Sequence, residues 1–196
     1  MISDIESFLR YFDAVHRRAM RDVGALPPEA ERWAPPPLRP VRRAQGRQAQ
    51  GERGENAWGI GEIVRHMAGS RLYFARAYRG EGWIAGWPAP INTEVQSTWL
   101  PALEASAAEF RRRVEGTPNE WLTRRVPLID SEGTISGWRI LMMMLEHDIH
   151  HRSQIDTYAG LNGWEPPHIY GRSAEQVGLA RDRQRELHGE GTPERS

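Results

Sequence analysis

The stretch that decides the fold spans residues 136–163 and reads SGWRILMMMLEHDIHHRSQIDTYAGLNG. Its apolar residues recur at the spacing of one helical face. They are Ile140, Leu141, Met144, Leu145, Ile155 and Tyr158. Ser136 can cap the start of a helix, and Asn162-Gly163 is a good C-terminal stop signal. The pattern therefore predicts one long helix that packs its apolar face into a core.

Three histidines interrupt the apolar side of this helix, at positions 147, 150 and 151. On a helical wheel of about 100° per residue, His147 and His151 fall inside the apolar stripe and His150 falls at its edge. Imidazoles on a buried face need a polar partner. Side chains four residues apart lie one above the other, at a spacing that suits one divalent ion. The pair indicates either a metal site or two core histidines satisfied by hydrogen bonds.

The composition excludes several other kinds of chemistry. The 196 residues carry a net charge of zero, contain no cysteine, and include arginine but no lysine. Disulfides, thiolate ligands and a cysteine nucleophile are therefore excluded, as is Schiff-base chemistry on a lysine. The balanced charge offers no global field that would recruit nucleic acid or anionic lipid.

The N-terminus and the hydropathy indicate location and domain number. Residues 1–6 lack the basic and apolar regions of a secretory signal, and no window approaches the roughly 20 consecutive apolar residues of a membrane span. We therefore expect a cytoplasmic protein with no membrane partner. The length suits one domain, which we expect at residues 1–180, followed by a polar tail at 181–196.

The first helix is predicted from a capping box formed by Ser3 and Glu6 up to Gly24. Residues 35–57 then carry prolines, glycines, glutamines and five arginines without periodicity, so a long exposed loop insert is expected there. These arginines are the one feature that favours a nucleic-acid partner, but a solvated loop explains them better, so no nucleic-acid partner is expected.

Two further long helices follow the insert. The second is expected at residues 60–78, with Gly59 as its N-cap. A capping box of Thr93 and Gln96 begins the third, which Gly116 closes.

The remaining elements are short. Residues 126–135 carry a turn signal between two extended runs, which predicts either a small hairpin or an extended excursion with a tight turn. A last short helix is expected from Ser173 and should fade after Arg181. Four long amphipathic helices with almost no strand pattern predict an all-α, antiparallel four-helix bundle with a long loop after the first helix and a short C-terminal helix.

A third imidazole on another helix is needed to complete a metal site. His66 lies on the inner stripe of the helix at 60–78, so it is the best partner for His147 and His151. His16 is flanked by Arg17 and Arg18, which favours a position at the surface or rim.

Three neutral histidines and one open coordination position form a catalytic type of metal site. Zinc or nickel suits imidazole ligands, and the sequence does not decide between them. Glu62, four residues before His66, can hold the other ring nitrogen of that histidine. Asp148 is a second acid near the core face. Glu62 and Asp148 are thus the candidate catalytic acids.

Two blocks of sequence resemble the DinB/YfiT-like superfamily of metal-dependent helical bundles. They are WGIGEIVRHMA at residues 58–68 and HDIHHRSQI at residues 147–155. The resemblance extends from the first helix to about Val177. It implies a four-helix bundle, often a homodimer, in which a divalent ion is held by His66, His147 and His151. Ser153 stands where the family usually has glycine, and the insert at 35–57 is longer than expected.

Characterised members of that superfamily include S-transferases and isomerases that use a low-molecular-weight thiol, and metal-dependent hydrolases. The resemblance therefore implies a metal-dependent enzyme with a small-molecule substrate, most concretely of the thiol-dependent S-transferase or isomerase type. A metal-dependent hydrolase and a non-catalytic, stress-related metal-binding bundle are the alternatives. A cavity lined by Tyr73, Trp138 or Tyr158 beside the histidines would favour an enzyme.

Overall fold

The computed structural model describes residues 3–36, 57–86, 90–165, 168 and 174–188. Within this part of the chain it is mostly helical, with five α-helices and one small sheet. The α-helices are α1 (Ile5–Gly24), α2 (Ile60–Arg79), α3 (Trp99–Val114), α4 (Gly137–Leu161) and α5 (Ala174–Leu187). Short 3-10 helices lie at η1 (Pro28–Arg32), η3 (Gln96–Thr98) and η4 (Asn119–Leu122). Most of the predicted insert, residues 37–56, lies outside the described residues.

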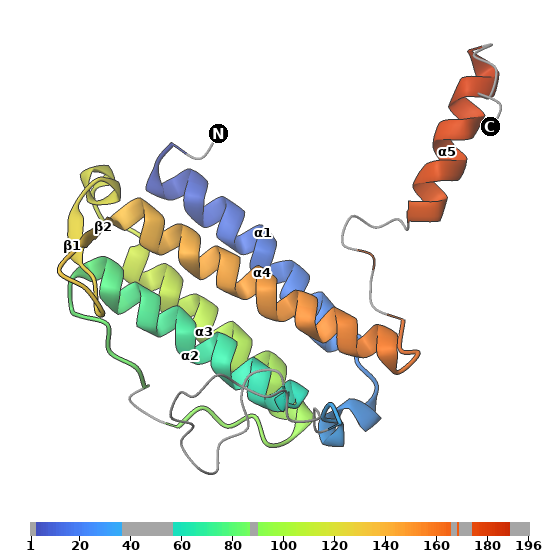
Figure 1. Ribbon diagram of the computed structural model, residues 1–196, viewed down its shortest axis with the longest axis horizontal. Coiled ribbons are helices and arrows are strands. Elements are labelled where there is room, and N and C mark those ends of the chain that lie inside the picture. The colour runs from blue at the N-terminus through green and yellow to red at the C-terminus, as the bar shows by residue number, and fades with distance from the viewer. Residues whose placement is uncertain (1–2, 37–56, 87–89, 166–167, 169–173, 189–196) are drawn as a thin grey trace.

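The four long helices α1 to α4 lie side by side (Figure 1). Helix α2 packs against α3 and α4, and α1 packs against the same two helices from the other side of the core. Helix α5 stands apart from them. Among the described helices, none combines the length and the apolar character that crossing a membrane requires.

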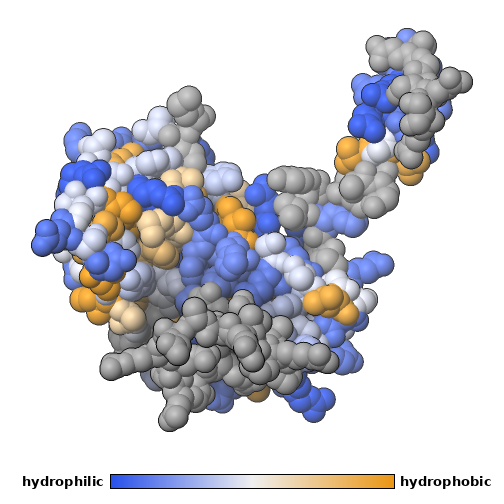
Figure 2. Space-filling view, in the orientation of Figure 1, coloured by the Kyte–Doolittle hydropathy of each residue, from blue (hydrophilic) through white to orange (hydrophobic). Residues whose placement is uncertain are grey.

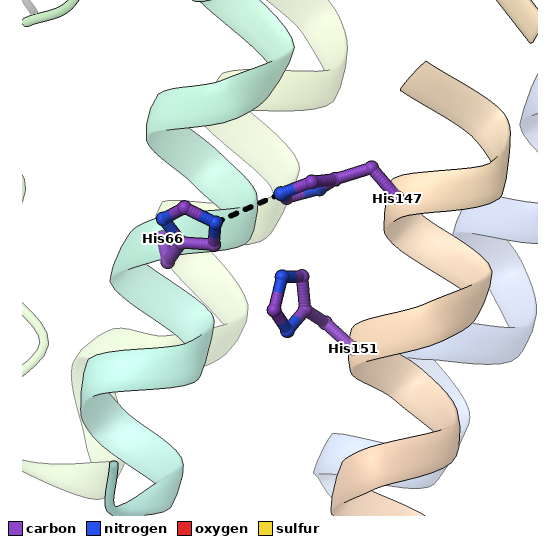
Figure 3. A group of neighbouring side chains, drawn as sticks. All are labelled: His66, His147 and His151. Carbon is purple, nitrogen blue, oxygen red and sulfur yellow. Dashed lines mark hydrogen bonds between the residues drawn. The ribbon is translucent and has the colours of Figure 1, made fainter. Parts of the chain in front are cut away.

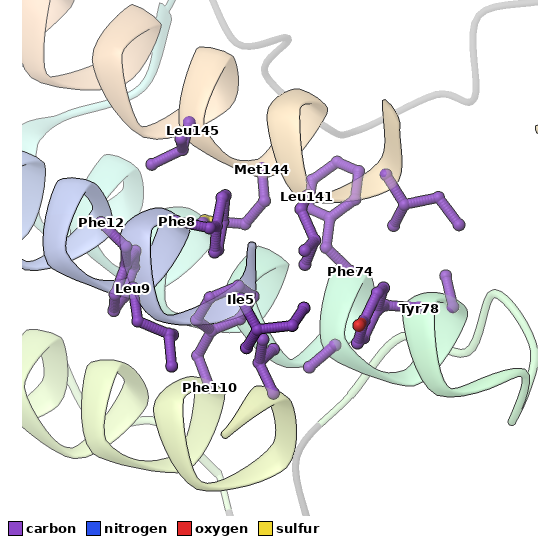
Figure 4. Close-up of a cluster of buried hydrophobic side chains, with 14 of the residues drawn as sticks. Ile5, Phe8, Leu9, Phe12, Phe74, Tyr78, Phe110, Leu141, Met144 and Leu145 are labelled. Carbon is purple, nitrogen blue, oxygen red and sulfur yellow. The ribbon is translucent and has the colours of Figure 1, made fainter. Parts of the chain in front are cut away.

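Two clusters of buried apolar side chains hold these helices together. The first joins the start of α1 to the ends of α2 and α3 and to the start of α4, and Figure 4 shows its aromatic centre around Phe8, Phe12 and Phe110. The second joins the opposite ends of the same helices, where Trp99 is fully buried. On the face drawn in Figure 2, apolar side chains gather over the end that carries the hairpin described next.

The predicted hairpin is confirmed as a two-stranded antiparallel sheet. Strand β1 (Arg125–Pro127) pairs with β2 (Thr134–Ser136), and Val126 lies opposite Ile135. The fold is therefore mostly helical with a small sheet rather than purely α-helical. Ser136 ends β2 and, as predicted, caps α4, because its hydroxyl accepts a hydrogen bond from the Arg139 N–H at 3.3 Å.

The N-terminal cap of α1 differs from the prediction by one residue. Asp4 is the N-cap, and its carboxylate accepts a hydrogen bond from the Ser7 N–H at 2.7 Å. The Ser7 hydroxyl accepts one from the Asp4 N–H at 3.2 Å. The predicted box of Ser3 and Glu6 is therefore wrong, because Asp4 and Ser7 have the same spacing and Asp4 is the residue in the extended cap conformation.

The cap predicted for the third helix is also wrong. The Gln96 N–H donates to the Glu31 carboxylate at 2.7 Å, and the Thr93 carbonyl accepts from the Trp99 indole at 2.9 Å. These two residues therefore tie the chain before α3 to its neighbours, and α3 itself begins at Trp99. The last helix, α5, continues to Leu187, beyond the predicted end after Arg181.

Candidate metal centre

Three histidine rings converge in the space between α2 and α4. His66 projects from α2, while His147 and His151 project from successive turns of α4 (Figure 3). The ring centroids lie 4.7 Å apart for His66 and His147, 4.8 Å for His66 and His151, and 4.4 Å for His147 and His151. The three residues selected from the sequence pattern are therefore neighbours.

The nitrogen atoms of these rings lie close enough to share one cation. The Nε2 atoms of His66 and His147 are 2.8 Å apart, and one nitrogen from each of the three rings lies within 4.8 Å of the others. Tetrahedral ligands at 2.0–2.1 Å from a zinc ion would be about 3.3 Å apart. The 2.8 Å separation of the two Nε2 atoms is shorter than this value, and the 4.8 Å limit for the set is longer. Small rotations of the side chains would therefore let the three imidazoles bind one metal ion.

The orientation of His151 is fixed by two further residues of α4. Its Nδ1 lies 3.1 Å from Gln154 Oε1, and Gln154 Nε2 donates to the Tyr158 hydroxyl at 2.9 Å. An amide oxygen only accepts hydrogen bonds, so Nδ1 of His151 carries the proton and Nε2 keeps its lone pair for a ligand bond. Gln154 was not among the predicted site residues. The sequence could have indicated Gln154 through its position, three residues after His151 on the same helix.

His147 is held in the neutral form. Burial is the main cause that lowers the pKa of His147 to about 3, and the repulsion that a protonated His147 would meet from His151, His66 and His150, whenever those rings carry a proton, contributes to the same shift. A neutral imidazole is the form that binds a metal ion. Nδ1 of this ring is buried and has no hydrogen-bond partner among the described residues.

Aromatic rings surround the three histidines. Trp58 lies 4.8 Å from the His66 ring and 6.4 Å from the His151 ring, and Phe74 lies 5.9 Å from the His147 ring. These contacts keep much of the cluster away from water, which strengthens electrostatic interactions within it.

A pocket of about 530 Å³ opens beside the cluster, and His66 and His147 form part of its lining. Tyr73 also lines it, as expected for an enzyme site. The other two aromatic candidates lie elsewhere. Trp138 packs against the first core cluster, and Tyr158 contacts Gln154 and the ring of Trp33.

The two candidate acids have structural partners. The Asp148 carboxylate accepts hydrogen bonds from Nε and Nη2 of Arg71 at 3.0 and 2.8 Å, and neither side chain is exposed. It thereby joins α4 to α2 within the core. The Glu62 carboxylate accepts from the Gly59 N–H at 2.8 Å, which confirms the predicted cap of α2. A role of Glu62 toward His66 stays a prediction.

His16 lies in the core and not, as predicted, at the surface or rim. It is buried, with only 8% of its surface exposed, and its Nε2 lies 3.1 Å from the Glu104 carboxylate of α3. The two arginines that follow it on α1 suggested a rim position, but His16 lies four residues after the buried Phe12 and stacks on its ring at 6.2 Å. His150, by contrast, is exposed on α4.

The fold and the site define a mostly helical protein with a three-histidine cluster able to hold a metal ion. The model of the DinB family matches residues 1–186, and the chain belongs to that family. None of the curated proteins matches the chain significantly.

Solved structures support the same fold. A DinB-like protein from Bacillus cereus ATCC 10987 superimposes with a TM-score of 0.61 at 15% sequence identity, over 86% of this chain and 99% of that one. A DinB-like protein from Bacillus subtilis has a TM-score of 0.56 at 15% identity, over 83% of this chain and 96% of that one.

Proposed function

We propose that the protein is a metal-dependent enzyme that binds one divalent ion through His66, His147 and His151. The observation that carries the proposal is the convergence of three imidazoles from two helices, with ligand atoms within 4.8 Å of one another. Zinc or nickel suits such a set of nitrogen donors. The neutral state of His147 and the hydrogen bond that orients His151 fit the same role.

The adjacent pocket supports catalysis over a purely structural site. A structural zinc site is closed by four protein ligands, whereas a catalytic site keeps a position open for substrate. Here the pocket reaches His66 and His147 directly. When bound, a divalent ion supplies Lewis-acid chemistry, which polarises a substrate group and stabilises a deprotonated thiol or water.

The reaction we propose is transfer of a low-molecular-weight thiol to an electrophilic small molecule, or isomerisation assisted by that thiol. The chain has no cysteine, so a thiol nucleophile must come from a second substrate. Hydrolysis is the alternative that the same three ligands support. Assays of the loaded protein with bacillithiol, mycothiol or glutathione and an alkyl halide distinguish S-transfer from hydrolysis, because only S-transfer consumes the thiol as the carbon–sulfur bond forms and the halide leaves. Thiol-assisted isomerisation returns the thiol, so its signature is a substrate conversion that requires thiol without consuming it.

Metal binding itself is tested by elemental analysis and calorimetric titration with Zn²⁺ and Ni²⁺. Wild type should bind one ion per chain, and His66→Ala, His147→Ala and His151→Ala should each weaken binding strongly. His150→Ala is the matched control, because it removes an exposed imidazole from the same helix. Equal metal content in the wild type and all four variants would contradict the assignment.

Three features of the assembly are part of the proposal. We take α1 to α4 as an antiparallel four-helix bundle, residues 1–180 as its single domain, and a homodimer as the state in solution. The four-helix bundle is supported by the packing of α1 and α2, each of which contacts both α3 and α4. The homodimer is supported by the family resemblance, and light scattering coupled to size-exclusion chromatography tests it.

A further inference from the structure

The pocket beside the histidines has a mostly apolar lining. Two aromatic side chains, Tyr73 and Phe74, and three residues with small or no side chains, Gly69, Ala85 and Gly86, account for most of it. Its volume of about 530 Å³ lies within the range of 300–1,000 Å³ that is typical of small-molecule sites. The polar lining residues are Arg65, Ser70 and the two histidines, so a low-molecular-weight thiol with many polar groups would leave much of its polar surface unpaired here.

The outer wall of the pocket is held in place by the rest of the protein. The guanidinium of Arg76 donates to the carbonyl oxygens of Ile84 and Gly86 at 3.1 and 2.7 Å. The ring of Trp83 packs on Tyr73 at 5.5 Å, and its indole N–H donates to the Pro127 carbonyl at 2.8 Å. Residues 83–86 are thus tied to α2 and to β1, so the pocket is largely preformed.

Gly69 provides open space in the floor of this pocket. It lies in α2 one turn after Arg65, and a Cβ built at Gly69 would meet no atom within 4 Å. The other residues that line the pocket from α2 are Arg65, His66, Ser70, Tyr73 and Phe74. The lack of a side chain at Gly69 therefore leaves room for a ligand between the aromatic residues and the histidines.

We infer that this pocket binds the electrophilic co-substrate, and that this co-substrate has an apolar body about the size of one aromatic ring. The body would lie over Gly69 against Tyr73 and Phe74, with its reactive end toward His66 and His147. The placement of the reactive end rests on the proposed metal site. The apolar binding site rests on the pocket alone, so the two can fail separately.

The test uses two neutral fluorinated probes that are observed by ¹⁹F NMR. 4-Fluorobenzyl alcohol has an aromatic body, and 2-fluoroethanol has the same polar group without it. The metal-free wild-type protein should bind the first probe and leave the second free. Loading with Co²⁺, which is paramagnetic, should broaden the signal of the bound aromatic probe, because the pocket borders two of the proposed ligands.

The variant Gly69→Leu should fill the pocket, and its Cβ would meet no atom within 4 Å. The matched control is Gly160→Leu on α4, where a Cβ also meets no atom within 4 Å. Gly69→Leu should weaken binding of 4-fluorobenzyl alcohol by at least about tenfold, a change of roughly 1.4 kcal/mol, and should leave Co²⁺ content unchanged. Gly160→Leu should change neither quantity.

A third variant separates the two proposals. His151 is buried and is not among the residues that line the pocket, so His151→Ala should lose Co²⁺ and the broadening while the probe still binds. Equal binding of the aromatic probe by wild type and Gly69→Leu would overturn the pocket assignment, as would equal binding of the two probes. If wild type binds the aromatic probe but no Co²⁺, the metal site is wrong and the apolar pocket stands.

Discussion

Arg71 and Asp148 form an ion pair that is completely buried between α2 and α4. The Asp148 carboxylate lies 2.8 Å from Nη2 of Arg71, and both side chains are 0% exposed. The remaining Arg71 amino group donates to the Leu103 carbonyl at 2.7 Å and to the Ser106 hydroxyl at 3.0 Å. One arginine therefore joins α2, α3 and α4 within the core.

Removing Asp148 should destabilise the protein strongly, because it leaves the Arg71 charge buried without its counterion. We expect Asp148→Ala to lower the free energy of unfolding by about 3–5 kcal/mol in urea titrations. Glu146→Ala is the control, since it breaks an exposed pair with Arg139 and should cost no more than about 1 kcal/mol. Similar losses in the two variants would contradict a structural role for the buried pair.

Much of the candidate site could be predicted from the sequence because it follows helical periodicity. His147 and His151 fall in the apolar stripe of one helix, and His66 falls in the apolar stripe of another. These three side chains therefore come close together whenever the two helices face each other. The same logic identified Gly59 and Glu62 as the start of α2.

Features that depend on tertiary contacts were missed. Nothing in the local sequence pairs Arg71 with Asp148, which lie 77 residues apart, so Asp148 was interpreted as a candidate catalytic acid. The wall of the pocket depends on backbone carbonyl oxygens that accept hydrogen bonds from Arg76, and no side-chain pattern encodes that contact. His16 was placed at the rim on its charged neighbours, although its spacing from Phe12 indicated the core.

Gln154 should raise the metal affinity of the site by holding His151 in the right tautomer. We expect Gln154→Leu to weaken Zn²⁺ binding by about 10–100-fold in competition titrations with a chelator, as for other groups that orient a metal-bound histidine. Gln154→Glu keeps an acceptor at the Nδ1 of His151 and should lose much less. Ser153→Ala, an exposed neighbour, is the control. Equal affinity in Gln154→Leu and wild type would show that His151 needs no such support.

Two glycines of α2 should respond in opposite directions to the same substitution. At Gly69 a Cβ meets no atom within 4 Å, so Gly69→Ala should stabilise the protein by about 0.5–1 kcal/mol through helix propensity. At Gly61 a Cβ would lie 2.5 Å from the Thr93 carbonyl oxygen and 3.2 Å from the Trp99 indole nitrogen. Gly61→Ala should therefore destabilise by about 1–3 kcal/mol. Thermal unfolding of both variants checks the order, and a higher melting temperature for Gly61→Ala would contradict it.

A second buried charge cluster lies between α1 and α4. Asp22 and Asp156 flank one guanidinium, with Nε of Arg152 at 3.6 Å from Asp22 and 3.8 Å from Asp156. Burial raises the pKa of Asp156 to about 6, and the negative charge of Asp22 acts in the same direction. Burial also raises the pKa of Asp22. The cluster therefore holds more protons in the folded chain than these acids would hold in the unfolded chain.

The sign of the pH dependence follows from the raised pKa of Asp156. Its ordinary value is 3.8, so between about pH 4 and pH 6 the folded state binds more protons than the unfolded state, and this group's contribution to stability falls as the pH rises through that window. Replacing the acid by an amide, in Asp156→Asn, removes this titration.

The variant should be more stable than wild type by about 1–3 kcal/mol at pH 8, and the difference should shrink toward zero near pH 4. Urea unfolding of both proteins across this range gives the difference, with a substitution of an exposed acid, Glu132→Gln, measured alongside as the control. A difference that stays constant from pH 4 to pH 8 would mean that Asp156 titrates alike in the folded and unfolded chains.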